Sequence, residues 1–468
     1  MIQRKPHMKY FKYSGFMLLT FVCCFTAQAQ KTVTVREALD QALRNNLQVK
    51  QAMYQSSLSE EDVLQAKMER YPSLSSDITS RKTWGLTFDQ TSGQLINTSV
   101  TAAGVGLNAN MLLFGGFQRV NQIKANKYQL FADQSNVDKV KNDLVLSVIT
   151  KYLEALSNKD VAIAAQQQVK LSKEQLEAQQ SNYEVGNNTL ADLSQAKSQL
   201  ATDELNLTTA ENAYDLSILD LKQLMEMNPV NDIVLEKPPL PNVEKLVAAY
   251  VAEDIYQQAV QNYPDIKTAE YNSMVAKKNI DIAKGGLYPQ LSIGASYGTN
   301  YSSQASRRII GYEGDPSNPI PVYLDVSFGR QLDENRNRGI FAQLSIPIFD
   351  NYRRTITLRK AKVSYESAIN NELLAKNNLN KVINQAVLDL KTAEKRYYST
   401  QENFHSATDA FEVLQQRYDV GLANAVELST QQTAKNKAEF DFIQAKYDFI
   451  FKSKVIDFYL GRPITFNN

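Results

Sequence analysis

The sequence has very little of what most enzyme active sites need, because it contains only two cysteines and two histidines among 468 residues. Cys23 and Cys24 lie in an apolar N-terminal stretch, and His7 lies just before it. If that stretch is removed, the chain retains His405 and no thiol. A disulfide, a thiolate metal site, a cysteine nucleophile and a multi-histidine metal site within one chain are then excluded. We therefore expect neither enzyme activity nor a cofactor.

Neither sign of charge dominates the chain, and long apolar runs are lacking. The formal net charge is +1 with 22% charged residues, which gives no field that would attract nucleic acid. After the N-terminal stretch, no segment approaches the 18 or so consecutive apolar residues of a transmembrane helix. Any contact with a membrane is therefore expected to occur without transmembrane helices.

Residues 1–29 have the pattern of a secretory signal peptide. Lys9 and Lys12 supply positive charge, residues 16–25 form an apolar core, and Ala-Gln-Ala at 27–29 is a small-residue cleavage site. The alternative is a membrane-anchoring helix, but about ten apolar residues are too few to span a bilayer. The sequence therefore predicts an exported protein from which this segment is removed.

The rest of the chain is a tandem duplication. Residues 42–75 match residues 259–292 without a gap, and Phe-Gly-Gly-Phe-Gln-Arg at 114–119 matches Phe-Asp-Asn-Tyr-Arg-Arg at 349–354. The offset grows from 217 to 235 positions, so the second copy carries 18 extra residues between these blocks. Repetition of this kind predicts one fold built from two equivalent units. We expect a first repeat at 30–228, a linker at 229–250, a second repeat at 251–461 and a tail at 462–468.

Each repeat has a long stretch without helix breakers. Residues 117–185 and 351–420 contain neither proline nor glycine, and a continuous helix of that length would reach roughly 100 Å. A glycine, which can adopt the left-handed conformation that closes a helix, follows each stretch, and a second helical segment comes after it. Two adjacent apolar stripes on these helices fit neighbours on both sides. The sequence therefore predicts two long helical hairpins, and an ordinary coiled-coil bundle is the alternative.

Between the helices, the hydrophobic period changes from about 3.6 to 2 residues. Alternation around 105–111, 291–297 and 340–346, and more weakly over 73–88, predicts two strands in each repeat. Strands of about ten to fifteen residues have the length of transmembrane β-strands. An antiparallel sheet with one wet face would give the same pattern. Polar, turn-rich loops are expected at 89–97 and 301–339, and the extra residues of the second copy fall in the longer loop.

The order of these features resembles the TolC family of outer-membrane efflux proteins over residues 32–463. In each repeat, a helix, Tyr-Pro, two strands, Phe-x-x-[Phe/Tyr]-x-Arg, a long helix, Val-Gly and a second helix follow one another. The resemblance implies a mainly helical protein with a transmembrane β part. It also implies a homotrimer that forms a 12-stranded β-barrel continuous with a periplasmic α-helical barrel.

The same resemblance implies a passive exit duct in the outer membrane of a Gram-negative bacterium. Its partners would be outer-membrane lipid, a periplasmic membrane-fusion adaptor and an inner-membrane transporter of a tripartite efflux or type I secretion system. No nucleic-acid partner is expected. A secreted helical scaffold or adaptor without a pore is the alternative, although such a protein has no use for paired strands of membrane length.

Three residues of the hairpin tips correspond to a periplasmic gate in that family. Matching positions counted from the tip glycines imply a hydrogen-bonded pair of Tyr418 and Asp192, and a constriction lined by Glu427. Two positions depart from the family pattern, because Ala423 and Thr430 replace charged residues. We therefore expect fewer charge pairs and one ring of three Glu427 carboxylates. Helix N-terminal stabilisation is the alternative role for both acidic residues.

Two further sets of residues carry expected roles. The Val-Gly pairs are turn formers, and the resemblance implies that they also dock the adaptor: Val185, Gly186, Val420 and Gly421. Four residues beside the strands suit a membrane interface, although aromatic packing and solvated charges are the alternatives: Tyr71, Tyr288, Arg119 and Arg354.

Overall fold

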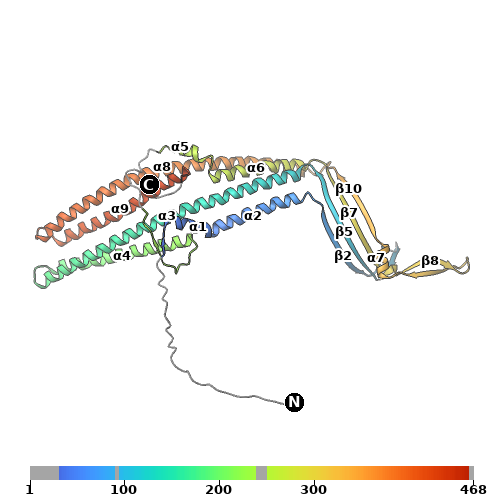
Figure 1. The fold of residues 1–468 in the computed structure, drawn as a ribbon, viewed down its shortest axis with the longest axis horizontal. Helices are drawn as coiled ribbons and strands as arrows, with labels where there is room; N and C mark the ends of the chain where they lie inside the picture. Colours follow the sequence, from blue (N-terminus) through green and yellow to red (C-terminus); the bar gives the residue numbers. More distant parts are fainter. Residues whose placement is uncertain (1–30, 90–93, 98, 239–249, 463–468) are drawn as a thin grey trace, which may run out of the picture.

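The computed structural model describes residues 31–89, 94–97, 99–238 and 250–462. The predicted signal peptide lies outside the described residues, as do residues 239–249 of the expected linker and 463–468 of the expected tail. The described chain is elongated, with a four-stranded sheet at one end and the tips of two helical hairpins at the other (Figure 1).

The same order of helices and strands occurs twice. The elements of the first half are β1 (Lys31–Val33), α1 (Val35–Asn45), α2 (Leu47–Met68), β2 (Ser73–Thr83), β3 (Leu86–Asp89), β4 (Gln94–Asn97), β5 (Val100–Gly115), α3 (Gln118–Glu184), α4 (Leu190–Leu224) and β6 (Ile233–Leu235). Those of the second half are α5 (Ala252–Ala259), α6 (Pro264–Gly285), β7 (Gln290–Ser302), a 3₁₀ helix (Ser303–Ser306), β8 (Arg307–Glu313), β9 (Ile320–Asp325), α7 (Phe328–Glu334), β10 (Asn337–Ser345), α8 (Arg353–Asp419) and α9 (Ala425–Tyr459).

The two long helical hairpins are confirmed. Helices α3 and α8 have 67 residues each, and α4 and α9 have 35 residues each. Since α4 is only about half as long as α3, it covers the half of α3 next to the tip. The other half packs against α2 and α6, where Ser59 bonds to Asp133 at 2.5 Å and the Gln118 amide donates to the Ile282 carbonyl at 3.1 Å. Every part of the long helices therefore has helical neighbours, as the two apolar stripes predicted.

A left-handed pair of residues turns each sheet strand into its long helix. Gly116 and Phe117 both have φ of 63°, and the equivalent Asn351 and Tyr352 have φ of 57° and 59°. The backbone at Gly116 also approaches Gly285 at the end of α6, so a β-carbon there would lie 2.1 Å from the Gly285 carbonyl oxygen. This contact fixes the first turn against the α6–β7 junction.

The main sheet is antiparallel with the order β10–β7–β5–β2. Residues directly opposite each other share a face of a sheet, and the register aligns Ile78 with Val105 and Ile340 with Ala295. One face is therefore largely apolar: Leu74, Ile78, Val105, Leu107, Ala109, Leu291, Ile293, Ala295, Tyr297, Ile340, Ala342 and Leu344. On the opposite face, the Asn108 amide donates to Asp77 at 3.0 Å. The outer strands β2 and β10 each have one strand neighbour within the described chain.

The two segments that were expected to be polar, turn-rich loops also contain regular structure. Residues 84–99 contain the β3–β4 hairpin, and residues 303–336 contain the β8–β9 hairpin and α7. The second segment is longer by the 18 residues that the repeat offset placed there. Regular structure arises because Ile309 and Ile310 on β8 and Ile320 on β9 are strand formers on either side of a turn at Gly314. The weak strand predicted over 73–88 ends at Thr83, before Gly85 with φ of 100°.

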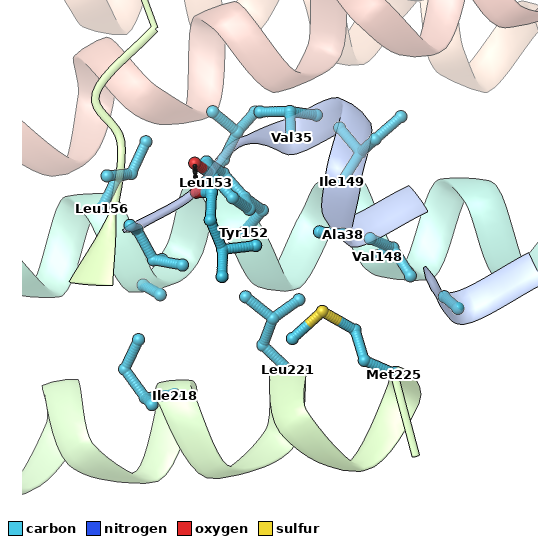
Figure 2. Packing of buried hydrophobic residues seen from close by; sticks show 14 of the residues in the cluster. Val35, Ala38, Val148, Ile149, Tyr152, Leu153, Leu156, Ile218, Leu221 and Met225 are labelled. Carbon is cyan, nitrogen blue, oxygen red and sulfur yellow. Dashed lines mark hydrogen bonds between the residues drawn. The ribbon is translucent and has the colours of Figure 1, made fainter. Parts of the chain in front are cut away.

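Two apolar clusters hold the middle of the molecule together. In the first, side chains of α1, α3 and α4 meet, and Tyr152 lies among Leu153, Leu221 and Met225 (Figure 2). The Tyr152 hydroxyl lies 2.8 Å from the carbonyl oxygen of Val33 and 2.7 Å from that of Glu236. It thereby joins α3 to the parallel pair of β1 and β6. The second cluster joins α5, α6, α8 and α9.

The contact between Gly116 and Gly285 predicts a position-specific effect of an added methyl group. Gly116→Ala should abolish most of the folded protein, because the backbone at Gly285 would have to move to make room for the added β-carbon. Gly186→Ala is the matched control, since Gly186 also has a positive φ, of 80°, but has open space around its α-carbon. Left-handed strain alone costs about 1–2 kcal/mol. The yield of folded protein in the detergent extract measures both, and equal yields would contradict the close contact.

Candidate functional site at the hairpin tips

Both hairpin tips close in the same way. Gly186 and Gly421 have φ of 80° and 76° and donate to the carbonyls of Tyr183 and Tyr418 at 3.0 and 2.9 Å. The next amides reach one residue further back, from Asn187 to Asn182 at 2.8 Å and from Leu422 to Arg417 at 2.7 Å. This pair of bonds is the Schellman motif, which ends a helix with a left-handed glycine. The expected turn-forming role of the tip glycines is thereby confirmed.

The tips expose apolar side chains in spite of their polar surroundings. Val185 and Val420, which precede the glycines, are 71% and 69% exposed. Leu190, Leu422 and Val426 lie nearby in the sequence and are also exposed. Each protomer therefore presents accessible apolar groups at the end of the molecule farthest from the sheet (Figure 1).

Asp192 and Glu427 cap the helices that follow the tips. The Asp192 amide donates to the Thr189 hydroxyl at 3.3 Å, and the Thr189 amide donates to the Asp192 carboxylate at 3.1 Å. Glu427 and Asn424 form the same reciprocal pair at 2.8 and 3.4 Å. These are capping boxes, which satisfy amides that a helix leaves unpaired in its first turn. The helix-stabilising role is thus present at both positions, and a gating role remains a prediction.

Tyr418 joins the two hairpins through Gln179. The Gln179 side-chain amide donates to the Tyr418 hydroxyl at 2.5 Å, and its oxygen accepts a bond from Asn188. Burial raises the pKa of the Tyr418 hydroxyl, and the charge of Asp192 raises it further, so the hydroxyl is neutral near pH 7. Asp192 is therefore near Tyr418, but its carboxylate bonds to Thr189. Gln179 could not be recognised from the sequence, because nothing distinguishes it there from a glutamine on an ordinary helix surface.

A cleft of about 580 Å³ separates the two hairpins behind their tips. Its lining is mostly amide side chains, with two carboxylates and a phenol: Gln175, Gln179, Asn182, Asn187, Asn188, Asp192, Gln195, Gln199, Gln415, Tyr418, Asp419, Asn424 and Gln432 among others. Neutral groups of this kind can exchange hydrogen bonds with water when the hairpins move, without leaving a charge unpaired. The neutral side chains of the cleft are therefore suited to a contact between two hairpins that move relative to each other.

The expected membrane-interface residues all lie where helices meet the sheet. Tyr71 precedes β2 and Tyr288 precedes β7, and both side chains are exposed. Arg119 donates to the Leu112 carbonyl oxygen at 3.3 Å, whereas the Arg354 guanidinium lies 3.7 Å from Asp350. Both arginines therefore have partners within the chain, and contact with lipid headgroups remains a prediction.

Two features are absent from the part of the chain that the structure describes. No group of three or more histidine, cysteine or acidic side chains is placed to hold a metal ion in this part of the chain. Among the helices that the structure describes, none combines the length and the apolar character needed to cross a membrane.

Comparisons with known proteins identify the class of this molecule. The family model described as "Outer membrane efflux protein" matches residues 38–225 and 255–462. The outer membrane efflux protein BepC of Brucella suis is 21% identical, over 92% of this chain and 85% of its own. The outer membrane protein TolC of Escherichia coli is also 21% identical, over 78% of this chain and 70% of its own. The solved structure of the outer membrane protein VceC from Vibrio cholerae has a TM-score of 0.72 at 16% identity, covering 91% of this chain and 94% of that one.

The chain joins a four-stranded sheet with one apolar face to two long helical hairpins. This combination defines a class of bacterial envelope proteins. Within that class, the chain belongs to the outer membrane efflux protein family. Its location is therefore the outer membrane of a Gram-negative bacterium, and its family consists of export channels rather than enzymes. The resemblance predicted from the repeated motifs is confirmed.

The bond between Gln179 and Tyr418 predicts an effect on the tips that is larger than the effect of losing the helix cap alone. Tyr418→Phe combined with Asp192→Ala should raise the single-channel conductance in planar bilayers, because one net hydrogen bond of about 0.5–1.5 kcal/mol between the hairpins disappears. Thr189→Ala is the control, since it removes the same cap, at a cost of about 1 kcal/mol, without touching Tyr418. An equal conductance change in both variants would assign the effect to the cap.

Proposed function

We propose that three copies of this chain close a 12-stranded β-barrel in the outer membrane. The observation that carries this proposal is the four-stranded sheet, which has one apolar face and two outer strands that each have only one strand neighbour among the described residues. In hydrocarbon, unpaired backbone groups cost several kcal/mol each, so a spanning sheet must have no free edge. Pairing of β2 in one protomer with β10 in the next satisfies both edges and repeats by symmetry.

The helices then continue the barrel as a periplasmic tunnel. Helices α3 and α8 start directly after β5 and β10, so a closed ring of strands brings a closed ring of helices with it. The polar face of the sheet, which includes Asp77 and Asn108, would line a wet passage. The resulting duct is passive, because nothing in a channel of this kind supplies energy. Substrates would be delivered by an inner-membrane transporter.

The hairpin tips are proposed to dock a periplasmic adaptor and to form the gate. The exposed Val185 and Val420 offer apolar contacts beside the Gly186 and Gly421 turns. The named relatives BepC, TolC and CusC are described as efflux or outer membrane proteins, which supports an exit duct of a tripartite efflux or type I secretion system. In this assembly, the two expected repeats, at 30–228 and 251–461, would make equivalent contributions to the wall of the duct.

A secreted scaffold without a pore is the competing proposal, and the sheet argues against it. Ile340 is 82% exposed on the apolar face, and Ile78 is 81% exposed. In water, a contiguous apolar face of this kind promotes aggregation. In lipid, the same face is solvated by the acyl chains.

The two faces of β10 predict opposite responses to a charge. Ile340→Arg should reduce the yield of heat-modifiable trimer, because an arginine facing lipid costs about 2–4 kcal/mol near the bilayer centre. Gln343→Arg, on the opposite face of the same strand, should leave the yield unchanged. Gel electrophoresis of unheated membrane extracts measures both. A mature protein that leaves the membrane fraction with carbonate alone would exclude the barrel.

The proposed ring of Glu427 predicts cation selectivity that is separable from helix capping. Glu427→Gln retains a side chain that can complete the capping box but removes the charge. It should reduce cation selectivity and cation block of the channel, since a ring of carboxylates favours cations. Asn424→Ala is the matched control, because it weakens the cap and leaves the charge. Unchanged selectivity in Glu427→Gln would leave capping as the only role.

A further inference from the structure

A buried carboxylate lies between the two hairpins without a cationic partner. Asp203 on α4 is 1% exposed, and within the described residues no lysine or arginine forms an ion pair with it. Its oxygens instead accept bonds from the Gln199 amide at 3.1 Å and from the Ser172 hydroxyl of α3. Neutral donors from the first hairpin thus hold this side chain.

The second hairpin orients both donors. The Gln432 amide of α9 donates to the Ser172 oxygen at 3.2 Å, and the Ser429 hydroxyl donates to the Gln199 oxygen at 2.6 Å. Gln195 donates to Ser429 at 3.0 Å. We call this set the Asp203 clasp, and it consists of Ser172, Gln195, Gln199, Asp203, Ser429 and Gln432.

The clasp resists separation of the hairpins more strongly than the contact at the tips. Moving α9 away would leave the Ser172 and Gln199 oxygens without their donors beside a buried charge, and partly satisfied buried networks are costly. At the tips, a single bond joins Gln179 to Tyr418 across the two hairpins. Asp203 lies 11 residues beyond Asp192 on α4, or about 16 Å along the helix axis.

The cleft described above spans the distance between these two contacts. Its lining runs from Gln179 and Tyr418 near the tips to Gln199, Ser429 and Gln432 of the clasp. The cleft therefore ends at the clasp, of which Gln195, Gln199, Ser429 and Gln432 form part of the lining. Ser172, Asp203 and Gln432 are each 1% exposed.

We infer that the Asp203 clasp is the fixed pivot of the proposed gate. It keeps α9 attached to the α3–α4 hairpin in every state of the channel, and only the segments on the tip side of Gln195 move. Asp203 is then a positioning residue, acting through Ser172 and Gln199. The inference rests on the proposed gate, and it adds the boundary between the moving and the static parts.

Two matched cross-links test this boundary. The first variant, Gln195→Cys with Ser429→Cys, and the second, Gln179→Cys with Tyr418→Cys, both place thiols at the lining of the cleft. The only native cysteines, Cys23 and Cys24, lie in the predicted signal peptide. Purified trimer is treated with a short bis-methanethiosulfonate, and conductance in planar bilayers is recorded before and after reduction.

We expect the clasp variant to open to the same conductance with the cross-link and after its reduction, whereas the tip variant should open only after reductant is added. If both cross-links block opening, the clasp itself must separate. The inference about the pivot is then wrong, but the proposed gate at the tips is retained. If neither blocks opening, the proposed gate at the tips is wrong, and the inference falls with it.

Hydrogen–deuterium exchange of the same trimer provides a test that requires no cross-linking. In the unmodified protein, amide protection on α9 should rise at Ser429 to Gln432. Ser429→Ala combined with Gln432→Leu should move this boundary toward the sheet, with exchange over the following two turns faster by roughly tenfold, as expected from the loss of two net hydrogen bonds. Glu427→Gln, one turn nearer the tip, is the control. A boundary that does not move would overturn the inference.

Discussion

The open edges of one small sheet determine much of the architecture. A strand in lipid cannot leave its N–H and C=O groups unpaired, yet β2 and β10 each have a strand on one side within the described chain. The register that places Ile78 and Ile340 on one apolar face makes water an equally poor environment. Under the proposed function, the chain can therefore be stable only among copies of itself. In the same proposal, the duplication supplies two pairs of strands per chain, and the turns and long helices position these pairs in a ring.

In the proposed assembly, the turns from sheet to helix connect the ring of strands to the helices on the periplasmic side. Each turn changes the direction of the backbone through two successive left-handed residues. The first copy uses Gly116 there, and its close approach to Gly285 ties the turn to the end of α6. The second copy uses Asn351, one of the few residues other than glycine that tolerates this conformation. Similar backbone geometry is thus reached with different residues.

The sequence predicted the parts of the fold that depend on local chemistry. Breaker-free stretches gave both 67-residue helices to within two residues at each end, because proline and glycine act on their own backbone. Stabilisation of a helix N-terminus by Asp192 was one of the two roles expected from its place after the tip glycine, and the structure adds its bond partner Thr189. By contrast, the bond from Gln179 to Tyr418 joins positions 239 residues apart. Glutamine has no periodic signature, and only the packing of two hairpins shows which glutamines are buried, so neither this contact nor the Asp203 clasp could be predicted.

Neutral hydrogen bonds give the proposed gate a particular energetic character. Ala423 and Thr430 lack charge, and the described contacts between the tips are made by amides and a phenol that stays protonated at neutral pH. Bonds of this kind are nearly isoenergetic with bonds to water, so opening exchanges partners at small cost and is little affected by salt. A buried carboxylate cannot make the same exchange without admitting water to a packed site. Asp203, whose buried side chain is held by Ser172 and Gln199, lies away from the tips. The contact between the hairpins at Asp203 therefore resists opening, whereas the contact at the tips opens easily.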